Sequence, residues 1–158
     1  MSVIIDLHNA SGDAAIPLRK QFKHWATAAM STIAPERKRV ALSIRIVDAS
    51  ESAELNSHYR HKQGPTNILS FPVPPELHKA ALLGDLAICA EIVAREASEQ
   101  HKTLDAHWAH LTVHGVLHLS GYDHEEEQAA DTMENIERKI LAELGYHDPY
   151  QDLTSIRP

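Results

Sequence analysis

The 158 residues fit one domain, and 43% hydrophobic and 23% charged residues are typical of an ordinary globular protein. Fifteen Lys and Arg against 22 Asp and Glu give a net charge of −7, which argues against a general nucleic-acid binder with a basic surface. The single cysteine, Cys89, excludes an internal disulfide and favours a reducing cytoplasm; no signal peptide or membrane span is expected.

The charge is unevenly distributed along the chain. Residues 1–75 carry a net charge of +3, whereas residues 76–158 carry −10. Any contact with RNA is therefore expected to be local and to lie in the N-terminal half. The acidic half offers a surface for a basic partner. Histidine is the unusual residue type, because six of the 12 histidines lie between His101 and His124.

In the N-terminal half, strands and helices alternate. The segment SVIIDL predicts a first strand, and the helical spacing of apolar residues in 16–33 predicts a helix. A basic turn, PERKRV, leads to a strand at 40–48 with one buried face. A short helix is expected at 50–60, with Ser50 or Ser52 as its N-cap. The prolines at 72, 74 and 75 assign the next β segment, 66–71, to an edge strand.

In the C-terminal half, LLGDLAICA predicts a strand that runs into a helix at 91–100. A long helix is expected from about Leu104 to Leu119, ended by Gly121 at a C-terminal cap position. The segment 125–145 predicts a last amphipathic helix with acids in its first turn. The order of elements indicates an α+β fold with one domain, 1–158.

The segment HGVLHLSGYDH contains three histidines with the spacing of a metal site. On a helix, His114 and His118 are four residues apart and project side by side, so both imidazoles can bind one ion. Gly121 can turn the chain back and bring His124 in as a third ligand. Three protein ligands are typical of an open, catalytic zinc site. His107 and His110 lie on the same stripe; they are either donors that support a ligand or, the favoured interpretation, packing residues, and they are excluded from the ligand set.

The residue after the first histidine separates two kinds of chemistry. Metzincin proteases have the same histidine and glycine spacing, with a glutamate general base after the first histidine. Here that position is Gly115, so peptide hydrolysis by that mechanism is not expected. Phosphodiester cleavage is easier to reconcile, because a metal and cations can stabilise charge at phosphorus. A glutamate introduced at 115 is expected to repel an approaching RNA phosphate.

The same segment resembles the H-G-x-L-H-L-x-G-Y-D-H signature of the YbeY family of bacterial endoribonucleases. The resemblance extends to LNSHYRHKQGPTNILSFP (residues 55–72), to LLGDLAIC and to LGYHDPY, and covers most of the chain from about Val40 to Tyr150. It implies a small mixed β-sheet of about four strands with helices packed around it. It also implies one zinc ion held by His114, His118 and His124, and a functional arginine matching Arg60.

The function that this resemblance implies is a zinc-dependent, single-strand-specific endoribonuclease. The family takes part in ribosomal RNA processing, notably late maturation of the 3′ end of the small-subunit RNA, and in ribosome quality control. The expected partners are single-stranded RNA, the ribosome or a small-subunit ribosomal protein, and a ribosome-assembly GTPase. The nucleophile stays open between water and the RNA 2′-hydroxyl.

Arg60 also stands out on chemical grounds, since it lies in the cationic segment HYRHK and a guanidinium can bind two phosphate oxygens. Tyr59 and Phe71 are candidates for base stacking or for core packing. Asp123 is expected either to orient a ligand imidazole or to cap the turn. Two other functions remain open: a metallopeptidase whose base comes from elsewhere, and a ribosome-assembly binding module in which zinc is structural.

Overall fold

The computed structural model describes residues 1–77, 81–123 and 125–151. Strands and helices alternate in the N-terminal half, as the sequence predicts, and three consecutive helices follow the last strand. In order they are β1 (Ser2–Asn9), α1 (Arg19–Ile33), β2 (Arg39–Val47), α2 (Ala49–Arg60), β3 (Ile68–Pro72), the 3₁₀ turn η1 (Pro75–Leu77), β4 (Leu82–Cys89), α3 (Ala90–Glu99), α4 (Leu104–Leu119) and α5 (Glu127–Glu143).

Four strands form one mixed sheet in the order β1-β2-β4-β3. β1 pairs with β2 and β2 with β4 in parallel, whereas β3 pairs antiparallel with β4. The expected α+β fold with a small mixed sheet is thereby confirmed. β3 lies at the edge, as its prolines predict, because a proline nitrogen cannot donate a hydrogen bond to a neighbouring strand.

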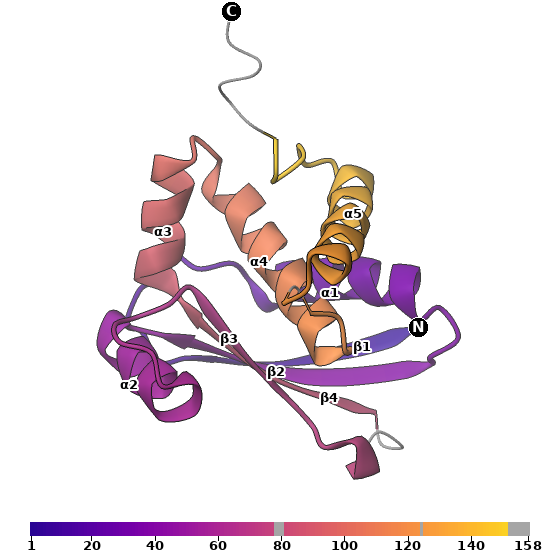
Figure 1. The fold of residues 1–158 in the computed structure, drawn as a ribbon, viewed down its shortest axis with the longest axis horizontal. Helices are drawn as coiled ribbons and strands as arrows, with labels where there is room; N and C mark the ends of the chain where they lie inside the picture. The colour runs from indigo at the N-terminus through magenta and orange to yellow at the C-terminus, as the bar shows by residue number, and fades with distance from the viewer. Residues whose placement is uncertain (78–80, 124, 152–158) are drawn as a thin grey trace, which may run out of the picture.

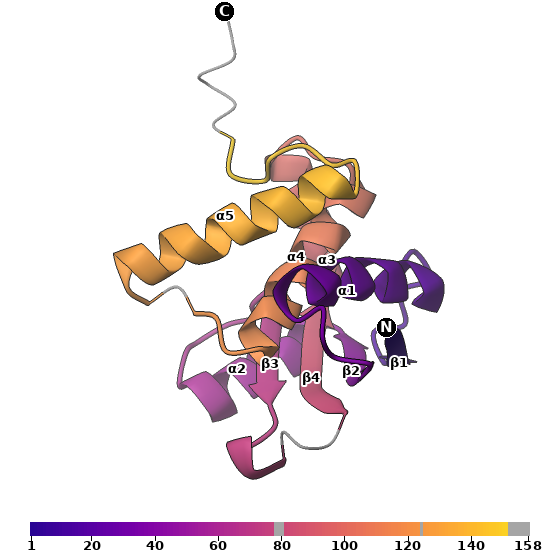
Figure 2. The ribbon, with the colours of Figure 1, turned by 90° about the vertical axis from the view of Figure 1, so that its right-hand side faces the viewer.

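One face of the sheet is covered by helices, with α1, α4 and α5 on the same side (Figure 1). The larger hydrophobic core lies between this face and the helices, and alternate residues of the strands supply it. Leu42, Ile44, Leu86 and Ile88 all point into it and are at most 2% exposed. α4 is the central helix of this layer, since it contacts α1, α3, α5 and the strands β3 and β4. A view from the side shows α1 beside α4 in this layer, with α5 on its outer side (Figure 2).

Among the described helices, α2 packs on the opposite face, over a smaller core. Leu55 of α2 packs there against a cluster that includes Leu69, Ala87 and Ile92. The N-cap of α2 differs from the prediction: it is Asp48, whose side chain accepts a hydrogen bond from the Glu51 backbone N–H, rather than Ser50 or Ser52. Ser52 is buried and instead bonds to the backbone of Thr66 with its hydroxyl. The β1 end of this face is exposed, as the 59% exposure of Ile4 shows.

Candidate metal centre

Helix α4 begins and ends at well-defined caps, and these set the positions of its histidines. Thr103 accepts a hydrogen bond from the Ala106 N–H at the start of the helix. At the other end, Gly121 has φ +102°, and the N–H groups of Gly121 and Tyr122 donate to the carbonyls of His118 and Leu117. This Schellman motif turns the chain directly after His118. The predicted helix bounds and the role of Gly121 are confirmed.

His114 and His118 face one another on consecutive turns of α4. Their Nε2 atoms are 3.1 Å apart and their ring centroids 4.6 Å apart. Two imidazole nitrogens that bind one tetrahedral zinc at 2.0–2.1 Å are separated by roughly 3.3 Å. The observed spacing therefore fits a shared ion with little movement of either ring. The third predicted ligand, His124, lies outside the described residues.

The other ring nitrogen of His114 is held by a buried carboxylate. Nδ1 of His114 lies 2.6 Å from Oε1 of Glu137, which is on α5 and 0% exposed. The Tyr150 hydroxyl donates to Oε2 of Glu137 at 2.5 Å, and Nε2 of His110 lies 3.2 Å from the same hydroxyl. We assign the proton of His114 to Nδ1, so its Nε2 carries the lone pair that a metal needs. A carboxylate that accepts this N–H is the usual support of a metal-binding histidine.

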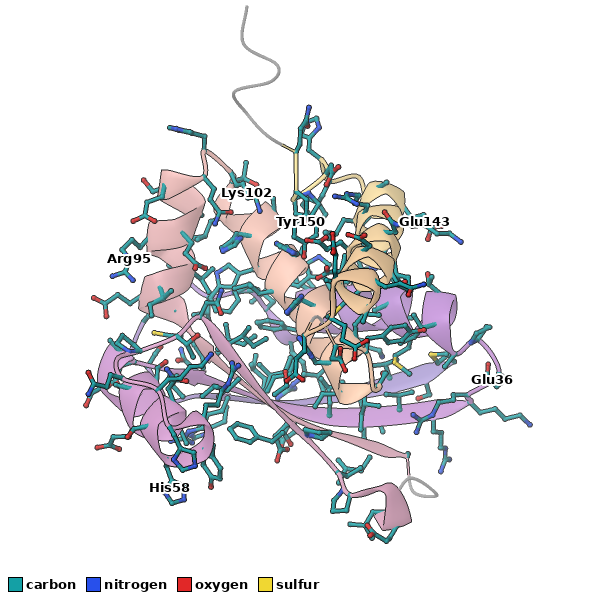
Figure 3. All side chains as sticks on the ribbon, in the orientation of Figure 1. Glu36, His58, Arg95, Lys102, Glu143 and Tyr150 are labelled. Atoms are coloured by element: carbon teal, nitrogen blue, oxygen red, sulfur yellow. The ribbon has the colours of Figure 1, made fainter. Side chains whose placement is uncertain are left out.

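The surroundings of Glu137 keep it ionised. Burial alone would raise its pKa, but hydrogen bonds from His110 and His114, with a further one from Tyr150, lower the pKa to about 2. Burial and the neighbouring Glu137 charge raise the pKa of Tyr150, so its hydroxyl keeps its proton and remains a donor. Oε2 of Glu137 therefore also accepts a hydrogen bond. Through this bond Tyr150 connects the C-terminal segment to α5 beside the candidate metal centre (Figure 3).

A second group of donors overlaps this network. One nitrogen each of His110 and His114 and a carboxylate oxygen of Glu137 lie within 4.8 Å of one another and could hold a metal ion. In the structure these atoms already bond to one another and to Tyr150. An ion bound there would have to replace those contacts. His110, for which the sequence favours packing over support of a ligand, thus lies beside the centre, and burial lowers its pKa.

His107 belongs to a separate buried pair. Its Nε2 lies 2.9 Å from Oε1 of Glu96, which also accepts from the side-chain amide of Asn67. Burial lowers the pKa of His107, although the bond to Glu96 opposes this effect. The pair links α4 to α3 and to the residue before β3. The structure thus gives His107 a local partner that accounts for its burial.

Gly115 faces the sheet. A Cβ at this position would lie 2.8 Å from side-chain atoms of both Ile68 and Leu86. The absence of a side chain therefore lets α4 approach β3 and β4 closely. The expectation that residue 115 faces an approaching phosphate is wrong, because this side of α4 packs on the sheet. The inference that no acid stands there to act as a base is unaffected.

Arg60 lies on a different side of the molecule from the imidazole pair. It is the exposed last residue of α2, which packs on the opposite face of the sheet from α4. The edge strand β3 lies between them, with Ile68 toward α4 and Phe71 in contact with Tyr59 at a ring distance of 5.0 Å. Arg60 can reach a substrate bound at the imidazoles only around this edge. Tyr59 is 57% exposed, whereas Phe71 packs on the smaller core.

Asp123 is exposed, and its carboxylate accepts the Glu125 backbone N–H at 3.4 Å. Of the two roles expected for Asp123, this contact matches capping of the turn. The sequence analysis missed Glu137 and Tyr150 as functional residues. A signal for Glu137 was present, since it lies on the apolar stripe of α5 between Met133 and Ile140, where a charged residue needs a partner.

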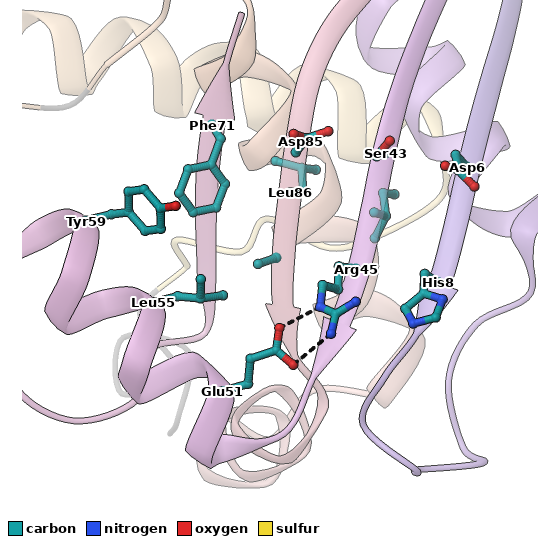
Figure 4. Close-up of a pocket in the computed structure, with 12 residues that line it drawn as sticks. Asp6, His8, Ser43, Arg45, Glu51, Leu55, Tyr59, Phe71, Asp85 and Leu86 are labelled. Carbon is teal, nitrogen blue, oxygen red and sulfur yellow. Dashed lines mark hydrogen bonds and ion pairs between the residues drawn. The ribbon is translucent and has the colours of Figure 1, made fainter.

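Two hollows differ sharply in charge. The first, of about 430 Å³, lies beside the imidazole pair and is lined by His118, Tyr122 and Arg37 among apolar residues. The second, of about 530 Å³, lies on the open face of the sheet (Figure 4). It contains Asp6, Glu51 and Asp85, and Arg45, the one arginine among its described lining residues, pairs with Glu51 through two hydrogen bonds. An anionic substrate is therefore compatible with the first hollow and disfavoured by the second.

Comparisons with known proteins agree on one family. The family model described as Endoribonuclease YbeY matches residues 6–145. A Coxiella burnetii protein named Endoribonuclease YbeY is 48% identical over 151 residues, which cover 95% of this chain and 99% of that protein. A Pseudomonas putida protein of the same name is 50% identical over 150 residues, covering 94% and 93%.

A solution structure of a Thermotoga maritima protein has a TM-score of 0.57 at 23% identity, and the match covers 94% of this chain and all of that one. This likeness supports the fold. Among the helices that the structure describes, none combines the length and the apolarity required to cross a membrane.

Proposed function

Because the chain belongs to the YbeY endoribonuclease family, we propose that it is a metal-dependent endoribonuclease that cleaves single-stranded RNA. The observation that carries the proposal is the pair of Nε2 atoms of His114 and His118, 3.1 Å apart beside an anion-compatible hollow. Glu137 bonds to the other ring nitrogen of His114, Nδ1, and so favours the tautomer whose Nε2 can bind a metal.

The proposed cofactor is one zinc ion per chain, with His114, His118 and His124 as its ligands. Such an ion supplies Lewis-acid stabilisation of the charge that develops at phosphorus. We place it at the Nε2 pair rather than among His110, His114 and Glu137. The Nε2 position keeps the hydrogen bond between Nδ1 of His114 and Glu137 intact, whereas the other position removes it.

Arg60 is proposed as a second source of charge stabilisation. Its guanidinium can bind two phosphate oxygens at once, and its exposed position at the end of α2 leaves it accessible to RNA. Because α2 packs on the far face of the sheet, this role requires the RNA strand to pass around β3. A direct test of that requirement is given in the Discussion.

The biological role proposed is ribosomal RNA processing in the cytoplasm, with late maturation of the small-subunit 3′ end and ribosome quality control as the specific tasks. The partners proposed are a small-subunit ribosomal protein and a ribosome-assembly GTPase. The family membership supports these tasks. The acidic C-terminal half is also suited to a basic partner.

The test is cleavage of a labelled single-stranded RNA by highly purified protein, before chelation, after chelation and after zinc is returned. We expect cleavage that chelation abolishes and zinc restores, with a duplex of the same sequence cut more slowly. Product ends distinguish the nucleophile, since attack by the 2′-hydroxyl leaves a cyclic phosphate.

Two other results of this test would support the competing functions. Stoichiometric zinc without RNA cleavage, together with normal ribosome maturation, would favour a binding module with structural zinc. Cleavage of labelled peptides instead of RNA would favour a metallopeptidase with a base other than residue 115.

A further inference from the structure

The hollow beside His118 is assembled from four parts of the chain. Its walls come from the end of α1, the turn into β2, the facing ends of β3 and β4, and the turn after α4. Met30 and Leu83 represent its apolar wall, and Tyr122 supplies a half-buried aromatic ring. A volume of about 430 Å³ is within the range of about 300–1,000 Å³ that small-ligand sites occupy. It is continuous with the candidate metal centre, because His118 lines both.

Arg37 is the charged member of this lining. Among the described residues that form the walls, none is Asp, Glu or Lys. The side chain of Arg37 is half-buried, yet within residues 1–77, 81–123 and 125–151 no ion pair or side-chain hydrogen bond involves it. By contrast, Arg45 and Arg138 each pair with a carboxylate. A partly desolvated guanidinium without a partner favours an incoming anion.

We propose that Arg37 binds a phosphate of the RNA strand next to the one at the imidazole pair, and so anchors the substrate in the hollow. This subsite rests on the proposed function, since it assumes an RNA substrate at His118. The molecule is acidic overall, so a phosphate chain needs a local cationic entrance. Arg37 provides one together with the exposed Lys38 and with the exposed Arg39 at the start of β2, close to the labelled Glu36 (Figure 3).

The shape of the hollow assigns different roles to its parts. Apolar walls around Arg37 reduce the local dielectric constant and strengthen its attraction for phosphate. The Tyr122 ring offers a face on which an unpaired base can stack, which favours single strands over a duplex. Arg37 thus acts in binding, whereas the imidazole pair marks the position of the chemistry.

The test compares Arg37→Gln with Arg39→Gln. Arg39 is a matched control, because it lies two residues further on at the start of β2, carries the same charge and is exposed rather than part of the hollow. Binding of a fluorescent 2′-O-methyl single-stranded oligonucleotide to zinc-loaded protein is followed by anisotropy at several salt concentrations. Since the 2′-hydroxyl is blocked, binding is measured separately from turnover by that nucleophile.

Arg37→Gln is expected to weaken binding about 10-fold and to reduce the salt dependence by about one phosphate contact. Arg39→Gln is expected to have a smaller effect, and Arg37→Lys to recover part of the loss. Zinc content and circular dichroism should be unchanged, because no described ion pair is lost. With cleavable RNA, KM should rise while the single-turnover rate at saturating RNA stays near that of the parent protein.

Equal weakening by Arg37→Gln and Arg39→Gln would overturn the subsite, since it would indicate only diffuse attraction by the turn. Unchanged binding by Arg37→Gln would overturn it as well. The outcomes for the proposed function are separate. If the parent protein cleaves RNA and Arg37→Gln has no effect on binding, only the subsite fails. If Arg37→Gln weakens binding but the parent protein never cleaves RNA, only the proposed function fails.

Discussion

Oε1 of Glu137 lies 2.6 Å from Nδ1 of His114, so a fully buried carboxylate on α5 sets the orientation of an imidazole on α4. The two residues are 23 positions apart in the sequence. The bond joins the last helix to the central one and fixes the ring of His114 with Nε2 toward His118.

The first prediction concerns this bond. Glu137→Gln removes the charge that stabilises the Nδ1–H tautomer, so zinc affinity should fall about 10–100-fold. Tyr150→Phe leaves the carboxylate in place but removes one of its donors and should have a smaller effect in the same direction. Competition with a chromophoric chelator measures both affinities.

A matched control is available in the other buried pair. Glu96→Gln makes the same chemical change in the carboxylate that bonds to His107. His107 lies on α4, as His114 does, but its bond to Glu96 is separate from the Nε2 pair. Glu96→Gln should leave zinc affinity unchanged. If Glu137→Gln and Glu96→Gln behave alike, the carboxylate on α5 has no special relation to the metal.

The second prediction concerns acid. Burial lowers the folded-state pKa of His107 below the usual 6.5, so the unfolded state binds more protons as the pH falls below that value. Stability is therefore complete above about pH 6.5 and decreases on acidification. Glu137 adds a further loss between 4.5 and about 2, because its pKa is lowered in the folded state. Urea unfolding of zinc-free protein at pH 7.5, 6 and 5 measures the slope.

His107→Gln should reduce that slope between pH 6.5 and 5 but not abolish it, because burial also lowers the pKa of His110; it also lowers stability at neutral pH by disturbing the contact with Glu96. A free energy of unfolding that rises on acidification through this range would contradict the neutral, buried state of His107.

The third prediction concerns Gly115. Gly115→Glu puts a side chain against Ile68 and Leu86, where even a Cβ is 2.8 Å from both. We expect a loss of several kcal/mol in the free energy of unfolding, from overpacking and from burial of an unpaired carboxylate. No peptidase activity should appear. Thermal unfolding measures the loss, and a variant as stable as the parent protein would mean that α4 does not pack closely on β3 and β4.

The fourth prediction distinguishes the role of Arg60 from the binding role proposed for Arg37. Arg60→Ala should leave folding and zinc content nearly intact, because Arg60 is exposed and remote from the imidazoles. If it stabilises charge on phosphate, the single-turnover rate at saturating RNA falls roughly 10²–10³-fold, and Arg60→Lys recovers part of it. If it only tethers RNA, the loss depends on salt and saturating RNA restores the rate.

Helix α4 and its turn could be predicted from the sequence because their signals are local. Leu104–Leu119 is bounded by Thr103 and Gly121, and the spacing of four residues places His114 beside His118 within one helix. The edge position of β3 followed from its prolines in the same way.

The relations that could not be predicted connect distant segments. Glu137 reaches His114 only because α5 packs on α4, and Tyr150 joins them from the C-terminal segment. The charged Glu137 on an apolar stripe indicated a buried partner but could not identify it. Asp48 replaced the expected serine caps because Ser52 is used by the Thr66 backbone, 14 residues away. The orientation of Gly115 toward the sheet likewise depends on tertiary packing.

The most direct test of the central claim is single-turnover cleavage of single-stranded RNA by the parent protein, His118→Ala and His110→Ala, purified identically and with zinc content measured in each sample. Placement of the ion at the Nε2 pair predicts about one zinc and rapid cleavage for the parent protein. It predicts little zinc, and cleavage no faster than after chelation, for His118→Ala. His110→Ala should keep most of both. Cleavage and zinc content at the parent level in His118→Ala, with loss of both in His110→Ala, would contradict the account and place the ion among His110, His114 and Glu137.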